Sequence, residues 1–180
     1  MLVRPVRWSD FDDLREMYYG LYEERERGDF VGIHLFTDRP SPADEVAWFS
    51  AAYRRVLEGD AVFSVAEEGG RVVGNCMIAC ASPSARSETG HVGVLGILVH
   101  HDHRGKGVGR ALLAHALDAC RGRFEVVRLS VWVGNDRAKH LYEQFGFTTV
   151  GRIPREVRRG GQYFDSYEMV RVLPPAPENP

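Results

Sequence analysis

The sequence lacks several features that mark particular protein classes. It has no long uninterrupted apolar run, and Arg4, Arg7 and Asp10 interrupt its start, so it predicts neither a membrane-spanning helix nor a secretory signal peptide. It has only three cysteines among 180 residues and no CxxC spacing, which favours reduced thiols in the cytoplasm. Its formal net charge is only −2. We therefore expect a cytoplasmic protein that binds neither membrane nor nucleic acid.

The most distinctive segment is a glycine-rich turn, Arg104-Gly105-Lys106-Gly107-Val108-Gly109, which follows a β-branched apolar run and precedes a helical apolar pattern. Such a turn presents unpaired backbone N–H groups and the positive end of a helix dipole, and glycine lets a phosphate approach closely. The spacing fits neither the G-x-x-x-x-G-K-[ST] loop nor the G-x-G-x-x-G fingerprint. By itself the turn leaves open a phosphate site or a tight strand-to-helix connection.

Hydrophobic periodicity predicts a mixed chain of strands and helices. We expect strands near 2–7, 61–67, 71–81, 91–99, 126–133, 147–153 and 162–172, and helices over 9–27, 42–59, 107–121 and 135–145. Ser9 is the expected N-cap of the first helix. The sum is an α/β or α+β sandwich with helices on both faces of a mixed sheet. We predict a single domain over 1–173 and, from its four prolines, a disordered tail over 174–180.

A second motif lies about thirty residues beyond the turn. Residues Asn135 to Phe147 read N-x-x-A-x-x-x-Y-x-x-x-G-F. Together with the R-x-x-G-x-G of the turn and the Leu98-Val99 pair before it, this pattern resembles the GCN5-related N-acetyltransferase (GNAT) family. The resemblance implies an acyl-CoA N-acyltransferase fold, whose mostly antiparallel sheet of about seven strands splays between strands 91–99 and 126–133.

The resemblance also implies acetyl-coenzyme A as co-substrate. Its pyrophosphate would bind the amides of the glycine turn, and its pantetheine arm would pair with the strand before it. The residues assigned to it are Ile97, Leu98, Val99, Arg104, Gly105, Lys106, Gly107, Val108, Gly109, Asn135, Ala138 and Tyr142. Asn135 is alternatively a helix cap.

Tyr142 is the expected catalytic residue, because by analogy with the family it protonates the departing thiolate. A phenol pKa near 10 suits a donor that must stay protonated at pH 7. The alternative is that Tyr142 is one more aromatic residue of the core face of its helix.

A general base is harder to assign. The resemblance implies a carboxylate a few residues upstream of Ile97, where this chain has Gly93 and Val94. His91 and Glu88, at the start of the strand, are the nearest candidates, acting through a water; alternatively there is no dedicated base. Deprotonation at pH 7 costs about 1.4 kcal/mol for an α-amine and about 4.6 kcal/mol for a lysine. The missing carboxylate therefore favours an α-amine acceptor.

The C-terminal hairpin resembles that of free L-amino-acid N-acetyltransferases, and Arg155, Arg158 and Arg159 are candidates for binding an acceptor carboxylate. A solvated arginine cluster is the alternative. We expect a small amine acceptor, with an N-terminal or lysine side-chain acceptor on a protein and a non-catalytic acetyl-coenzyme A sensor as rival hypotheses. A homodimer is common in such families.

A histidine-rich segment, His100, His101, Asp102 and His103, enters the glycine turn. Because no cysteine ligand accompanies it, we predict no metal.

Overall fold

The computed structural model describes residues 1–82 and 87–174. A seven-stranded sheet of order β1-β2-β3-β4-β5-β7-β6 forms its centre. The elements are β1 (Leu2–Pro5), η1 (Trp8–Asp10), α1 (Phe11–Glu26), α2 (Pro42–Leu57), β2 (Ala61–Glu68), β3 (Arg71–Cys80), β4 (Val92–Val99), η2 (His101–His103), α3 (Val108–Ala119), β5 (Val126–Trp132), α4 (Asp136–Gln144), β6 (Thr148–Arg159) and β7 (Gln162–Val172). The predicted fold class is confirmed: the sheet is mixed, and five of its six strand pairs are antiparallel.

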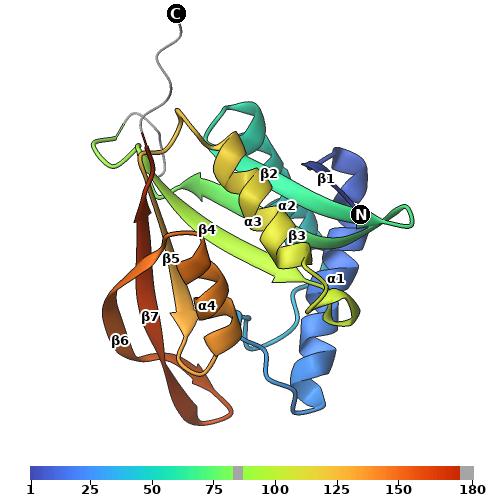
Figure 1. Cartoon of the computed structure of the whole chain (residues 1–180). Coiled ribbons are helices and arrows are strands. Elements are labelled where there is room, and N and C mark those ends of the chain that lie inside the picture. Colours follow the sequence, from blue (N-terminus) through green and yellow to red (C-terminus); the bar gives the residue numbers. More distant parts are fainter. Residues whose placement is uncertain (83–86, 175–180) are drawn as a thin grey trace, which may run out of the picture.

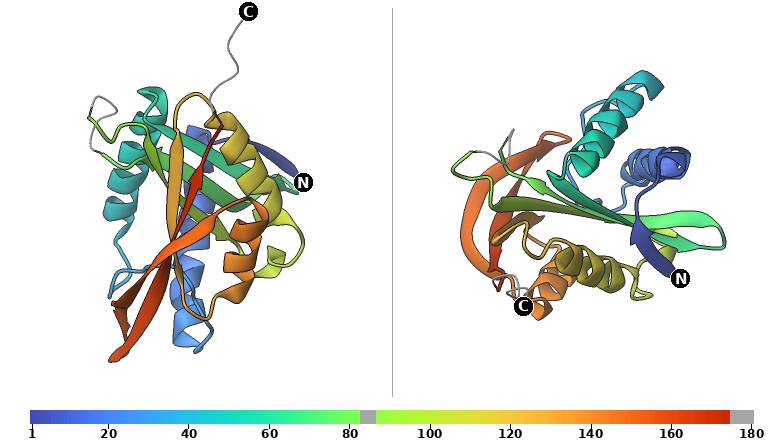
Figure 2. Two further views of the ribbon diagram at one scale, coloured as in Figure 1. Left: turned by 60° about the vertical axis from the view of Figure 1, so that its left-hand side comes forward. Right: turned by 90° about the horizontal axis from the view of Figure 1, so that it is seen from above.

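The helices form two layers around the sheet. α1 and α2 cover one face, and α3 and α4 cover the other (Figures 1 and 2). Each layer has its own apolar cluster, one centred on α3 with Leu112 and Leu113, the other on Phe49 of α2 with Met17 of α1. The sheet therefore separates two packed cores, and a ligand that touches both must pass through the sheet.

The sheet opens between β4 and β5. These two strands run parallel and pair only over Val92–Val94 with Val126–Arg128. β4 continues alongside β3 as far as Val99, while β5 turns away with β7 as its partner. The predicted divergence is thereby confirmed. Within the described residues, the part of β4 after Val94 has no strand beside it on the β5 side.

Two boundary predictions were wrong. Ser9 does not cap α1, because residues 8–10 form a 3₁₀ turn and α1 begins at Phe11. Asp10 organises this entry instead: its carboxylate accepts the Arg7 backbone N–H at 2.7 Å and pairs with Arg4 at 2.8 Å. β6 also continues past 153 to Arg159. Its register against β7 shifts between Thr149 and Gly151 and between Ile153 and Val157, so the residues between these positions bulge out of the pairing while the strand continues.

In the described ranges, 1–82 and 87–174, no helix combines the length and apolar character that crossing a membrane requires. Residues 175–180 of the expected tail lie outside these ranges. The tail and the single domain over 1–173 stay predictions.

Gly93→Ala is expected to destabilise the fold. A Cβ at Gly93 would lie 2.6 Å from Cγ2 of Ile78 and 3.0 Å from the Phe124 ring, and overpacking of this kind costs about 1–3 kcal/mol. Gly96→Ala on the same strand is the matched control, because its Cβ would meet nothing within 4 Å. Urea unfolding should show a lower midpoint for Gly93→Ala alone; equal midpoints would contradict the packing described here.

Candidate active site

A groove of about 440 Å³ lies on the α3 and α4 side of the open β4 edge. Its lining joins the end of β4, the glycine turn and one face of α4. The lining residues are Ile97, Val99, Arg104, Gly105, Gly107, Gly109, Arg110, Asn135, Arg137, Ala138, His140, Leu141, Tyr142 and Gln144. The turn and the α4 motif, which are separated by about thirty residues in the sequence, thus face one another.

The glycine turn leaves the start of α3 open to an anion. Gly105 and Gly107 have φ values of 83° and 86°, a left-handed conformation that strains other residues. Gly107 is also the N-cap of α3, and no side chain among the described residues caps this helix. Its first N–H groups and the positive end of its dipole are therefore presented to the groove.

Two arginines add positive charge beside the turn, and the sequence analysis did not identify either. Arg137 of α4 lies against Gly105, so close that a Cβ on that glycine would be 2.7 Å from its Nη2. Arg110 of α3 bonds to Gln144 and lies over the Phe145 ring, 5.6 Å from its centroid. Arg137 lies within the N-x-x-A motif. A positive charge in a motif expected to face the glycine turn could have identified it as a candidate phosphate-binding residue. The set of donors fits a pyrophosphate.

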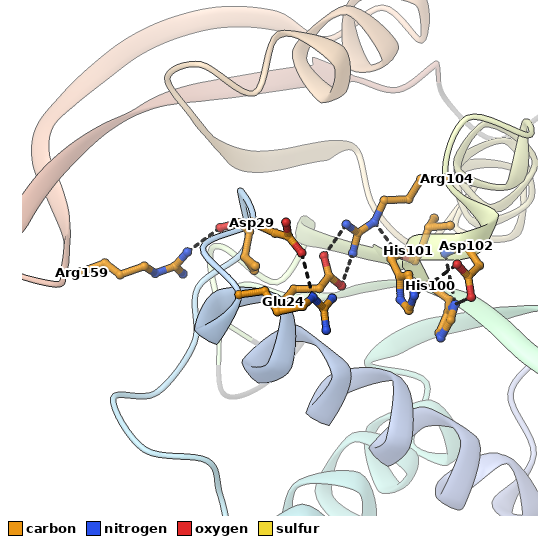
Figure 3. Close-up of polar contacts among 10 residues, drawn as sticks. Glu24, Asp29, His100, His101, Asp102, Arg104 and Arg159 are labelled. Carbon is orange, nitrogen blue, oxygen red and sulfur yellow. Dashed lines mark hydrogen bonds and ion pairs between the residues drawn. The ribbon is translucent and has the colours of Figure 1, made fainter.

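The side chain of Arg104 is engaged within the protein, whereas the predicted phosphate contact concerns its backbone amide. Its guanidinium binds both oxygens of the Glu24 carboxylate, at 2.6 and 2.8 Å, and its Nε donates to the Val99 carbonyl at 3.0 Å (Figure 3). Glu24 is 4% exposed. This side chain therefore ties the glycine turn to the end of α1, and only its backbone is left to meet a ligand.

Three of the residues predicted to bind the co-substrate do not line the groove. Lys106 is exposed, and Val108 is buried in the core under α3. Leu98 points to the opposite face of the sheet, as strand alternation requires, and lines the second cavity. Their backbone groups remain part of the segments that border the groove.

Tyr142 of α4 lines the groove. It is 7% exposed and packs edge-on against Phe147, with ring centroids 6.0 Å apart. Burial raises the pKa of its phenol far above the ordinary value, so the hydroxyl stays protonated at neutral pH. Asn135 caps the same helix, since its side-chain oxygen accepts the Ala138 N–H at 3.3 Å. Of its two predicted roles, the helix cap is therefore confirmed.

A second cavity, also of about 440 Å³, lies on the α1 and α2 side of β4. Its lining residues are Leu14, Tyr18, Ile33, His34, Phe36, Pro40, Asp44, Glu45, Trp48, Phe63, Asn75, Met77, Gly96, Ile97 and Leu98. Ile97 lines both cavities. The two cavities therefore meet at the part of β4 that has lost its strand partner, one from each face of the sheet.

The segment between α1 and α2 closes this second cavity and is held by the C-terminal hairpin. Arg159 of β6 donates to the carbonyls of Val31 and Ile33 at 2.7 and 2.9 Å. Its guanidinium also stacks on Trp132, 4.3 Å from the ring centroid. Gly32 meets the Asn135 side chain so closely that a Cβ there would be 2.4 Å from Nδ2. The irregular segment is thus fixed to both α4 and β6.

The three hairpin arginines that were candidates to bind an acceptor carboxylate lie outside the two cavities. Arg159 is occupied as described, and Arg155 stacks on Tyr163, 3.9 Å from the ring centroid. Arg158 is exposed. None of the three lines either cavity.

His91 and Glu88 are both exposed and precede β4, at the end of the strand opposite Ile97. Six residues of extended strand, about 20 Å, separate His91 from Ile97. The structure brings neither residue to the lining of either cavity. At the two positions where the resemblance implied a carboxylate, Gly93 faces the core without room for a side chain, and Val94 is apolar.

The donor atoms of His100, His101 and Asp102 lie within 4.8 Å of one another on the η2 turn (Figure 3). His101 and Asp102 are exposed, and the two imidazoles are 4.3 Å apart between centroids. These three groups offer fewer ligands than a closed structural zinc site requires, and the prediction of no metal stays a prediction.

Comparison with known proteins agrees with this geometry. A model of the acetyltransferase (GNAT) family matches residues 8–147. The L-amino acid N-acetyltransferase AaaT of Escherichia coli K12 is 33% identical, over 96% of this chain and 98% of its own length. The L-amino acid N-acyltransferase MnaT of the same organism is 32% identical, over 92% and 90%. The structure of yncA from Salmonella typhimurium, solved with its cofactor acetyl-CoA, covers 100% of this chain and 98% of its own with a TM-score of 0.81 at 23% identity.

Arg137→Ala is expected to weaken acetyl-CoA binding about tenfold, because one charge-assisted hydrogen bond to a phosphate contributes about 1.5 kcal/mol. Its guanidinium forms no ion pair with the other described residues, so the melting temperature should not fall. Calorimetric titration measures the affinity. Arg121→Ala is the control, because Arg121 is exposed, lies beyond the end of α3 and pairs with Asp118. Equal losses of acetyl-CoA affinity in the two variants would contradict the role assigned to Arg137.

Proposed function

The chain belongs to the acetyltransferase (GNAT) family and is an acetyl-CoA-dependent acetyltransferase, and on this premise we propose that its acceptor is the primary amine of a small molecule. Amino acids and their derivatives are the first candidates, because two relatives that match over more than 90% of this chain are named as L-amino acid N-acetyltransferase and L-amino acid N-acyltransferase. The observation that carries the proposal is the meeting of two separate cavities at Ile97.

The groove fits the co-substrate on its own chemistry. The uncapped start of α3 and the guanidinium of Arg137 suit the pyrophosphate, and the apolar wall of Ile97, Val99 and Leu141 suits the pantetheine arm. The unpaired side of β4 offers backbone groups for strand-like pairing with the pantetheine amides. When bound, acetyl-CoA supplies an acetyl thioester, which is activated for attack by an amine.

Two chain groups are assigned to the transfer. The backbone of β4 near Ile97 polarises the thioester carbonyl, and Tyr142 gives its proton to the sulfur as the carbon–sulfur bond breaks. The nitrogen lone pair of the neutral amine forms the new carbon–nitrogen bond directly, with no covalent enzyme intermediate. His91 and Glu88 have no part in this scheme, since they lie at the far end of β4.

A thiol-release assay tests the proposed acceptor class. The protein is mixed with acetyl-CoA and a panel of amino acids, amino-acid amides, arylalkylamines, polyamines and short peptides, and free coenzyme A is followed with a chromogenic reagent. Fastest release with small amines is the expected result. Release with peptides alone would favour a protein acceptor and contradict the proposal.

Tyr142→Phe is expected to reduce kcat by about 100-fold, the lower end of what a general acid contributes. The dissociation constant for acetyl-CoA should stay within twofold, because the ring and its packing on Phe147 are kept. A non-catalytic sensor would lose nothing on this change. Stopped-flow turnover and calorimetric titration on the same preparation separate the two, and unchanged kcat would remove Tyr142 from the chemistry.

A further inference from the structure

Three carboxylates are buried in the described part of the chain: Asp10, Glu24 and Glu45, which are 5%, 4% and 6% exposed. Two of them have an arginine partner, since Asp10 pairs with Arg4 and Glu24 with Arg104. A buried carboxylate without such a partner is costly to the fold. The third therefore requires a different explanation.

Glu45 has no such partner. Among the described residues, none forms a hydrogen bond or ion pair with its carboxylate. The charge of Arg15 acts on it electrostatically, but the Arg15 guanidinium is itself paired with Asp12 at 3.0 Å and lies over Phe11. Burial, and then the neighbouring Asp44, raise the pKa of Glu45, as expected for a carboxylate whose charge is not compensated.

The surroundings of Glu45 indicate which cation it can receive. It lines the second cavity, whose floor is Gly96, Ile97 and Leu98 of β4. None of the lining residues is an arginine or a lysine, and the one imidazole among them, His34, forms no ion pair with Glu45 in the described part of the chain. A ligand ammonium would therefore supply the missing partner charge. The other walls are mainly apolar and aromatic, with Leu14, Phe36, Trp48, Phe63 and Met77.

We propose that Glu45 binds the ammonium group of the acceptor, and that the acceptor is an amine on an apolar or aromatic body whose carboxyl group is absent or blocked. Glu45 and Asp44 both repel a free carboxylate in this cavity, and the hairpin arginines that were candidates to bind one are engaged elsewhere. Amino-acid amides and arylalkylamines meet these requirements. The inference rests on the proposed function and narrows its acceptor class.

The first test compares three acceptors that share one ring: 2-phenylethylamine, L-phenylalaninamide and L-phenylalanine. At saturating acetyl-CoA, the first two should have kcat/KM values at least tenfold above that of the free amino acid. An equal or higher value for L-phenylalanine would overturn the acceptor class. If none of the panel amines releases coenzyme A, the proposed function fails, and the inference fails with it.

The second test replaces the carboxylate. Glu45→Gln should raise KM for 2-phenylethylamine at least tenfold and leave the affinity for acetyl-CoA unchanged. Glu58→Gln, at the exposed C-terminal end of the same helix, is the matched control. Turnover that continues with an unchanged KM in Glu45→Gln would overturn the role of Glu45 while leaving the proposed function intact.

A stability measurement tests whether Glu45 instead has a structural role. Glu45→Gln and Glu45→Leu should melt at or above the temperature of the unaltered protein, because each removes a buried, unpaired charge. Calorimetric titration of 2-phenylethylamine into the protein with coenzyme A should show binding that Glu45→Leu abolishes. A lower melting temperature for both variants, with amine binding retained, would show that Glu45 supports the fold rather than the acceptor.

Discussion

The site depends on one constraint, the early divergence of two parallel strands. β4 and β5 pair over only three positions, Val92–Val94 with Val126–Arg128. Had they paired to their ends, the sheet would separate the two faces completely, and the groove and the second cavity would not meet. Because they diverge, Ile97 is reached from both sides, and a donor on one face can pass a group to an acceptor on the other.

Long-range contacts hold the opening in shape. Arg104 binds the buried Glu24, which fixes the glycine turn to α1 on the opposite face of the sheet. Arg159 binds the carbonyls of the segment between α1 and α2, which fixes the cover of the second cavity to β6. Each contact uses a guanidinium that donates two hydrogen bonds, a geometry that lysine does not reproduce. Arg104 and Arg159 thus position two backbone segments, the glycine turn and the segment between α1 and α2.

The parts of the site that sequence reasoning predicted are those with local patterns. The glycine turn requires left-handed backbone at Gly105 and Gly107, and most of the Asn135-to-Phe147 motif lies on one helix. Both features therefore appear in the sequence as residues at a fixed, local spacing. The fold class followed from the same periodicity. The Ser9 cap failed because the competing Asp10, one residue later, also binds Arg4, a contact that no local pattern encodes.

The acceptor side could not be predicted in the same way. Its residues come from α1, α2, β2, β3, β4 and the irregular segment between the first two helices, which has no period. The isolation of Glu45 is visible only when its neighbours are in place. The hairpin arginines illustrate the converse, because their sequence suggested an acceptor site and their contacts with Tyr163 and with the 31–33 backbone place them elsewhere.

The account rests on passage of the acetyl group across the open edge of β4. A crystal structure with a bisubstrate compound, in which the sulfur of coenzyme A is joined through an acetyl linker to 2-phenylethylamine, tests this most directly. The account predicts that the coenzyme part lies along Ile97 and Val99 to the glycine turn, and that the aromatic part lies in the cavity beneath Glu45. Both parts on the same face of the sheet would contradict it.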